Sequence, residues 1–170
     1  MTTLPEPLET LSTPLAVDQL SEEMTERSID VGADDRAALA KRLDLPAVNA
    51  LSGTLKAVRH GTLIHIDGRI DAELERTCVV SLEPMSETVG EDFSTDYTTD
   101  LAEGMDDDIE GDLDAPELLE GETLDLGDVL LEQLVLAMTP HPRKEGAEAP
   151  NDPGAGKESS PFDVLKALKS

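Results

Sequence analysis

The stretch that decides the fold is Thr62-Leu-Ile-His-Ile-Asp-Gly-Arg-Ile-Asp-Ala-Glu-Leu-Glu-Arg76. Its apolar side chains fall on one parity, and its charged side chains fall almost entirely on the other. The apolar set is Ile64, Ile66, Ile70, Ala72 and Leu74. Alternation with a period of two is typical of an antiparallel strand that buries one face and exposes the other. Gly68 interrupts the alternation and predicts a bulge or a bend.

Two neighbouring stretches can pair with this strand. Residues 48–59 precede it, with His60-Gly61 as the expected turn. Residues 88–98 follow it, with Val89, Phe93 and Tyr97 as apolar anchors. The three stretches together predict an antiparallel meander. Shorter runs at 15–20, 27–31 and 122–126 are further strand candidates.

Helical patterns flank the meander. Residues 34–45 have Asp34 or Asp35 as a candidate cap, several alanines, and Pro46 as a stop. Residues 127–138 carry an apolar stripe at helical spacing, and Pro140 ends it. We therefore predict an α+β fold in which an antiparallel sheet, either open and curled or barrel-like, carries two or three packed helices and an acidic loop.

Composition shifts along the chain suggest its domain organisation. Residues 1–14 are expected to be flexible, and residues 15–142 to form a single α+β domain with an acidic insert at 100–121. Residues 143–159 are rich in Pro, Gly, Ala, Ser and Glu, which is a linker composition. Residues 160–170 predict a short helix, with Ser160 as its cap and Pro161 in its first turn.

Charge is distributed unevenly along the chain. The formal net charge is −25, and residues 77–142 contain nineteen Asp and Glu but no Lys or Arg. Residues 36–76, by contrast, hold seven of the thirteen Lys and Arg. A strongly acidic surface repels phosphate backbones and anionic lipids and attracts basic proteins. The charge therefore favours a binding or assembly role with a basic protein.

The insert supplies the candidate partner-binding residues, which are Asp106, Asp107, Asp108, Glu110, Asp112 and Asp114. Residues 106–117 also place acidic side chains at the ligand positions of a calcium loop. Glu110 at position 5 and Pro116 at position 11 depart from that pattern, and the flanks do not predict helices. A solvated acidic loop is the favoured interpretation, with a calcium-binding or general interaction module as the alternative.

Nothing in the sequence indicates an enzyme. Cys78 is the single cysteine, and no histidine has ligand spacing to it. Because Cys78 ends an apolar strand face, we expect a small core residue there. No catalytic residue, metal site or cofactor is predicted. A single cysteine fits a reducing, intracellular setting. No stretch reaches the length of a membrane span, and the N-terminus does not resemble a secretory signal.

A second binding hypothesis uses the basic residues of the predicted hairpin and its surroundings. Lys56, Arg59, Arg69 and Arg76 are the candidate RNA contacts. Arg69 and Arg76 have opposite parity, so they do not share a strand face. No aromatic residues are interleaved with these cations to stack on bases. RNA contact is therefore the less favoured mechanism.

Two longer stretches resemble a known family. Arg76-Thr-Cys-Val-Val-Ser-Leu-Glu-Pro84 follows the long strand, and Leu124 to Ala147 contains Pro140-His-Pro-Arg-Lys-Glu-Gly-Ala147. Their order and content are similar to the YceD family, the large ribosomal RNA subunit accumulation proteins, in its alphaproteobacterial-type branch. The residues that carry the resemblance are Cys78, Leu82, Glu83, Pro84, Pro140, Pro142, Arg143 and Lys144.

The resemblance implies a cytoplasmic, non-enzymatic bacterial protein that supports accumulation of large-subunit ribosomal RNA. A ribosomal protein of the large subunit, or its assembling particle, is the implied partner, since members are often encoded beside a small protein of that subunit. Many relatives carry Cys-x-x-Cys at this strand end and further cysteines later. Ser81 stands at the second position here, so a zinc role does not carry over to this chain.

Overall fold

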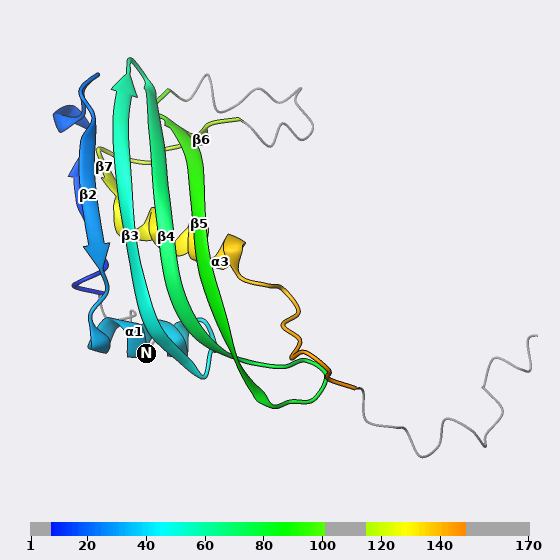
Figure 1. Cartoon of the computed structure of the whole chain (residues 1–170). Coiled ribbons are helices and arrows are strands. Elements are labelled where there is room, and N and C mark those ends of the chain that lie inside the picture. Colours follow the sequence, from blue (N-terminus) through cyan, green and yellow to red (C-terminus); the bar gives the residue numbers. More distant parts are fainter. Residues whose placement is uncertain (1–7, 101–114, 149–170) are drawn as a thin grey trace, which may run out of the picture.

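The computed structural model describes residues 8–100 and 115–148. Two α-helices, one short 3-10 helix and seven strands make up most of this part of the chain (Figure 1). In chain order they are β1 (Pro14–Ala16), the short 3-10 helix η1 (Val17–Gln19), β2 (Thr25–Asp30), α1 (Ala33–Arg42), β3 (Ala47–His60), β4 (Leu63–Thr77), β5 (Pro84–Thr98), β6 (Glu117–Leu118), β7 (Thr123–Asp125) and α3 (Leu126–Ala137).

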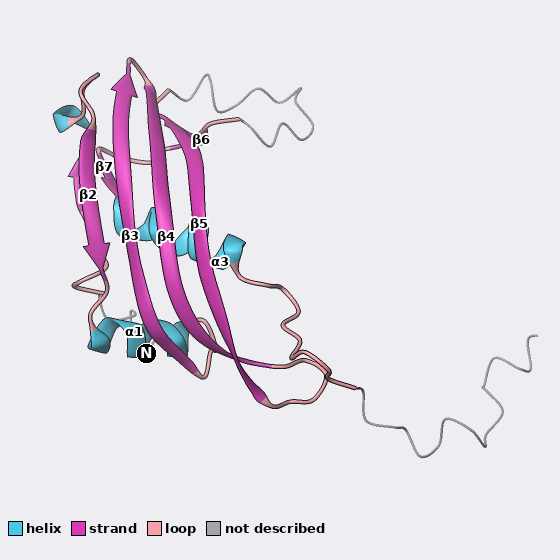
Figure 2. Cartoon of the chain, viewed as in Figure 1, coloured by secondary structure: helices cyan, strands magenta, loops and turns pink. Residues whose placement is uncertain are grey.

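The main sheet has five strands in the order β2-β3-β4-β5-β6, and β1 pairs with β7 in a separate two-stranded sheet. All pairs are antiparallel except the short β5–β6 pair, which is parallel. The predicted meander is therefore confirmed as β3, β4 and β5. Within the described residues, the sheet stays open and does not close into a barrel (Figure 2).

The sheet has one covered face and one open face. Helix α3 crosses behind β3, β4 and β5, and α1 lies at the end where β3 begins (Figure 1). The apolar side chains of β4 lie on the covered face. They belong to the same hydrophobic cluster as Val129, Leu130 and Leu134 of α3. Among the described residues, Tyr97 is the only aromatic side chain in the buried core, as the composition suggested.

We call the open side the outer face. It consists of the outward residues of β2 to β5, which are Glu26, Ser28, Asp30, Ala47, Ala50, Ser52, Thr54, Lys56, Val58, His65, Asp67, Arg69, Asp71, Glu73, Glu75, Ser86, Thr88, Gly90, Asp92, Ser94 and Asp96. The polar side chains of β4, from His65 to Glu75, lie on this face. The period-two pattern therefore correctly separated the two faces of the strand.

The bulge expected at Gly68 is absent. Gly68 pairs regularly with Leu55 and with Phe93, and the register shift between β3 and β4 lies between Val48 and Ala50. A Cβ at Gly68 would lie only 2.3 Å from Cζ of Phe93. The glycine is therefore explained by the Phe93 ring that lies over it on the covered face.

The first helix begins one residue before the predicted range. Its N-cap is Gly32, with no side-chain cap, so neither Asp34 nor Asp35 caps it. The Asp35 carboxylate instead accepts hydrogen bonds from the backbone N–H (2.6 Å) and the hydroxyl (2.6 Å) of Thr10. These bonds lower the pKa of Asp35. The helix ends at Arg42, before Pro46 is reached.

The remaining ranges differ in detail from the expectations. The run at 15–20 divides into β1 and η1, and the insert predicted at 100–121 contains β6 after Pro116. Within the stretch 1–14, Leu11 is 2 % exposed and belongs to the core cluster. Residues 101–114 and the C-terminal helix predicted at 160–170 lie outside the described residues. Among the described helices, none has the length and apolar character needed to cross a membrane.

Candidate functional site

The first element of the site is the tight connection between β4 and β5. Thr77 pairs with Pro84, and the Cys78 N–H donates to the Glu83 carbonyl (2.9 Å). The Leu82 N–H donates to the Cys78 carbonyl (2.9 Å), and Leu82 adopts a left-handed backbone with φ of 59°. A leucine rarely adopts this conformation. Its side chain is nevertheless 76 % exposed, so the loop presents an apolar group to solvent.

The second element is the segment after α3, which returns to this loop. The Val79 N–H donates to the Pro142 carbonyl (2.9 Å), and the Lys144 N–H donates to Cys78 Sγ (3.3 Å). Lys144 Nζ also pairs with Glu83 Oε2 at 3.0 Å. The two motif stretches that suggested the family therefore meet in space. We call this contact the junction (residues 78–84 with 139–147); Pro140 and Arg143 lie in its second segment, where both are exposed.

Arg76 and Glu87 support the junction from the covered face of the sheet. Their side chains are 10 % and 11 % exposed and form an ion pair. Arg76 also donates to the Thr139 carbonyl (3.1 Å), and Glu87 accepts from the Thr139 N–H (2.7 Å). Burial opposes ionisation of Glu87, but the Thr139 bond and the Arg76 charge outweigh it and lower the pKa of Glu87. The pair thus connects β4, β5 and the segment after α3.

Cys78 is fully buried, as expected, but its surroundings are polar. Its Sγ accepts hydrogen bonds from the Lys144 N–H (3.3 Å) and the Ser81 N–H (3.4 Å), and it lies outside the main apolar cluster. These donors stabilise the thiolate, the Lys144 N–H most strongly, and lower the pKa of Cys78 to about 6. The bond from Lys144 joins the two segments of the junction, and the bond from Ser81 lies within the first segment.

The lowered pKa makes a direct prediction. Absorbance at 240 nm should show the thiolate forming with a midpoint near pH 6, and Cys78→Ser provides the blank because the chain has no other cysteine. Since the folded pKa lies below the unfolded value, this group adds stability as pH rises from about 6 towards the ordinary thiol pKa near 8.5, and loses it below. Cys78→Ser should abolish that increment. A midpoint above pH 8 would contradict the prediction.

The four residues predicted to contact RNA do not gather into one patch. Lys56 and Arg69 lie on the outer face, Arg76 is buried beneath the junction, and Arg59 lies at the far end of β3. Arg59 donates to the carbonyls of Gly61 (2.8 Å) and Val17 (2.8 Å).

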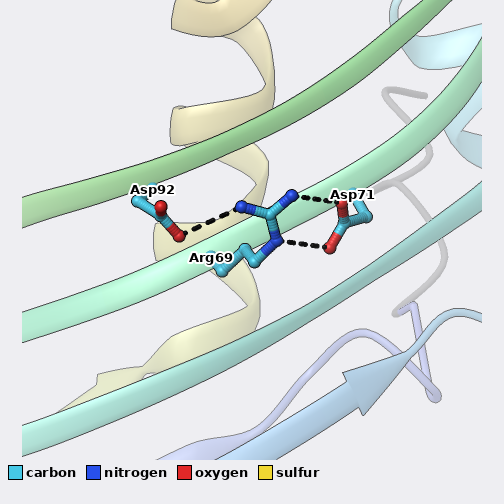
Figure 3. A network of polar contacts seen from close by, with 3 residues as sticks. All are labelled: Arg69, Asp71 and Asp92. Atoms are coloured by element: carbon cyan, nitrogen blue, oxygen red, sulfur yellow. Dashed lines mark hydrogen bonds and ion pairs between the residues drawn. The ribbon is translucent and has the colours of Figure 1, made fainter.

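The two outward cations already have carboxylate partners. Arg69 is held between Asp71 (3.1 Å and 3.2 Å) and Asp92 (3.3 Å), on the side of the sheet opposite α3 (Figure 3). Lys56 Nζ lies 3.8 Å from Glu26 Oε2. The sequence analysis did not predict that these two cations form ion pairs with carboxylates of the chain itself. The parity of Arg76, shared with Leu74, was the one signal that it points inward.

The proposed acidic partner-binding residues, Asp106 to Asp114, lie outside the described residues, as does most of the calcium-like pattern. In the part of the chain that is described, no group of three His, Cys, Asp or Glu is arranged to hold a metal ion. His65 has one carboxylate on each side, with Nδ1 2.7 Å from Asp96 and Nε2 3.3 Å from Asp67. The bond to Asp96 is the main cause of its raised pKa.

Comparison with known proteins gives one match. The model of the family described as large ribosomal RNA subunit accumulation protein YceD matches residues 66–169. This range contains most of β4, all of β5 and α3, and both segments of the junction. No curated protein and no solved structure matches the chain.

Proposed function

The chain belongs to the YceD family of large ribosomal RNA subunit accumulation proteins, and from this premise we propose that it supports assembly of the large ribosomal subunit by binding a basic ribosomal protein. It would act in the cytoplasm, without catalysis and without a cofactor. Accumulation of the subunit's RNA would then follow indirectly, because a supplied protein stabilises the particle that contains that RNA.

One observation carries the choice of a protein partner over RNA. All four cations that the sequence analysis named as candidate RNA contacts interact with a carboxylate or a carbonyl of the chain itself. Affinity for nucleic acid depends on cations that neutralise phosphates. Cations that are already paired, on a chain with net charge −25, contribute little to such binding. Complementarity to a basic protein instead gives fast, salt-sensitive association.

The test is an affinity purification of the tagged full-length protein from its own cells at low and moderate salt. Ribosomal RNA and ribosomal proteins are quantified in the same eluate. The proposal expects a basic large-subunit protein without stoichiometric RNA, and its loss as salt rises. Recovery of large-subunit RNA with a whole set of proteins would place the factor on an assembling particle. Recovery of neither would refute the ribosomal function.

A point variant separates the two mechanisms further. Lys56 is the least tightly paired of the four cations, because its Nζ lies 3.8 Å from Glu26 Oε2 and its side chain is 46 % exposed. If phosphate contacts mattered, Lys56→Glu would reduce the RNA recovered several-fold. We expect RNA recovery to stay at the wild-type level and protein recovery to stay the same or rise. A clear drop in RNA would favour the direct mechanism.

A further inference from the structure

The outer face is a surface that no other described element covers. It spans four strands, and the described helices lie on the opposite face or at the end of the sheet (Figures 1 and 2). An antiparallel sheet can leave one face in water. Two features distinguish this face: its net negative charge and the small side chains that surround some of its carboxylates.

The face has an excess of carboxylates. Strand β4 contributes four, Asp67, Asp71, Glu73 and Glu75, and β2 and β5 contribute two each. Lys56 and Arg69 are the only Lys and Arg residues of this face. With eight carboxylates, two cations and a neutral His65, the face has a net charge of −6. Both cations are already paired with carboxylates of this face.

Two of the β4 carboxylates, Glu73 and Glu75, have no side-chain hydrogen bond or ion pair among the described residues, whereas Asp71 is bound by Arg69. Asp71, Glu73 and Glu75 form a column, in which alternate residues lie about 6.7 Å apart. Their cross-strand neighbours in β3 are Ser52, Ala50 and Ala47, and those in β5 are Gly90, Thr88 and Ser86. These six cross-strand neighbours are all small, and the one long side chain beside the column is Arg69, which binds Asp71 at its end. Hollows of about 360 Å³ and 350 Å³ adjoin Arg69, which borders the column.

We propose that the outer face is the docking surface for a Lys- and Arg-rich segment of a protein partner. This inference rests on the proposed function and names the surface that would carry it. Long cationic side chains can reach Glu73 and Glu75 from above, because the cross-strand neighbours of both residues are small. RNA is the poorer occupant, since the face repels phosphates and presents no Phe, Tyr or Trp for base stacking.

The experiment compares two variants of the full-length chain with equal charge change. The outer-face variant replaces three outward carboxylates that have no side-chain hydrogen bond or ion pair among the described residues, as Asp30→Asn, Glu73→Gln and Glu75→Gln. The control variant replaces three exposed loop carboxylates, as Glu22→Gln, Glu23→Gln and Glu122→Gln. The probes are proteins extracted from purified large subunits, identified by mass spectrometry after capture, and protein-free large-subunit RNA. Circular dichroism confirms that both variants are folded.

We expect the wild type and the control to capture the same basic ribosomal protein, and the outer-face variant to bind it at least tenfold more weakly at low salt. Equal binding by both variants would overturn the outer face as the docking surface while leaving the proposed function standing. RNA capture that only the outer-face variant loses would overturn the choice of a protein occupant. No ribosomal protein bound by the wild type would overturn both the function and this inference.

Discussion

Replacing Arg76 with methionine is expected to lower the free energy of unfolding by about 3–5 kcal/mol, the range for removing one partner of a buried ion pair. The substitution keeps most of the side-chain volume but leaves Glu87, 11 % exposed, without its cation. It also removes the donor to the Thr139 carbonyl. Urea denaturation at pH 7, followed by circular dichroism, measures the loss.

Arg69→Met is the matched control. Arg69 lies on the same strand and bonds two carboxylates, but its side chain is 50 % exposed. Solvent-exposed ion pairs contribute about 0–1 kcal/mol, so this variant should lose no more than that. Adding Glu87→Gln to Arg76→Met should restore part of the stability, because the unpaired charge is then gone. Equal losses for Arg76→Met and Arg69→Met would contradict the assigned role of the buried pair.

The same variant should change the response to acid. In the wild type the pKa of Glu87 is lowered, so its contribution to stability is present above the unfolded pKa and is lost as pH falls through the folded value. Without Arg76, burial dominates and raises the pKa of Glu87. The deficit of Arg76→Met should therefore shrink between pH 7 and pH 4. A deficit independent of pH would mean that lost packing, and not the charge, is the cause.

Gly127→Ala is expected to destabilise the protein, although helices usually favour alanine over glycine. Alanine is normally favoured over glycine in a helix by about 1 kcal/mol. At position 127, however, a Cβ would lie 2.1 Å from the carbonyl oxygen and 2.7 Å from the carbonyl carbon of Leu11. Overpacking of this kind typically costs about 1–3 kcal/mol. Because the contact is with backbone atoms, we expect the upper end of this cost, about 3 kcal/mol. Subtracting the alanine preference leaves a net loss of about 2 kcal/mol, seen as a fall of about 4–8 °C in Tm.

The backbone around Gly127 has little room to yield. The Asp125 carboxylate accepts from the Gly127 N–H (2.8 Å), the Thr13 N–H (2.7 Å) and the Ser12 hydroxyl (2.6 Å). The start of α3 is thus bound to the segment that contains Leu11. Gln133→Ala, within the same helix, is the control and should change Tm by no more than 1–2 °C, as expected of a substitution with small energetic effect. A Gly127→Ala variant as stable as the wild type would show that this segment can move.

Local patterns predicted the parts of the fold whose physics is local. The alternation from Ile64 to Leu74 identified β4 and its two faces, because successive side chains of a strand point to opposite sides. The apolar stripe after Gly127 identified α3. The cap of α1 was predicted wrongly, because Asp35 bonds Thr10, a residue 25 positions away that no local pattern of the helix contains.

The sequence by itself determined the strands of the meander, the helix that covers them, the excess of negative charge and the two motif stretches of the family. The tertiary structure alone decided that these stretches meet through Cys78 and Lys144, which are 66 positions apart, and that Arg76 is buried while Arg69 is exposed with carboxylate partners. The physical reason is that parity and helical periodicity depend on neighbouring residues. Ion pairing and burial depend instead on which distant backbone segments the completed sheet and α3 bring together.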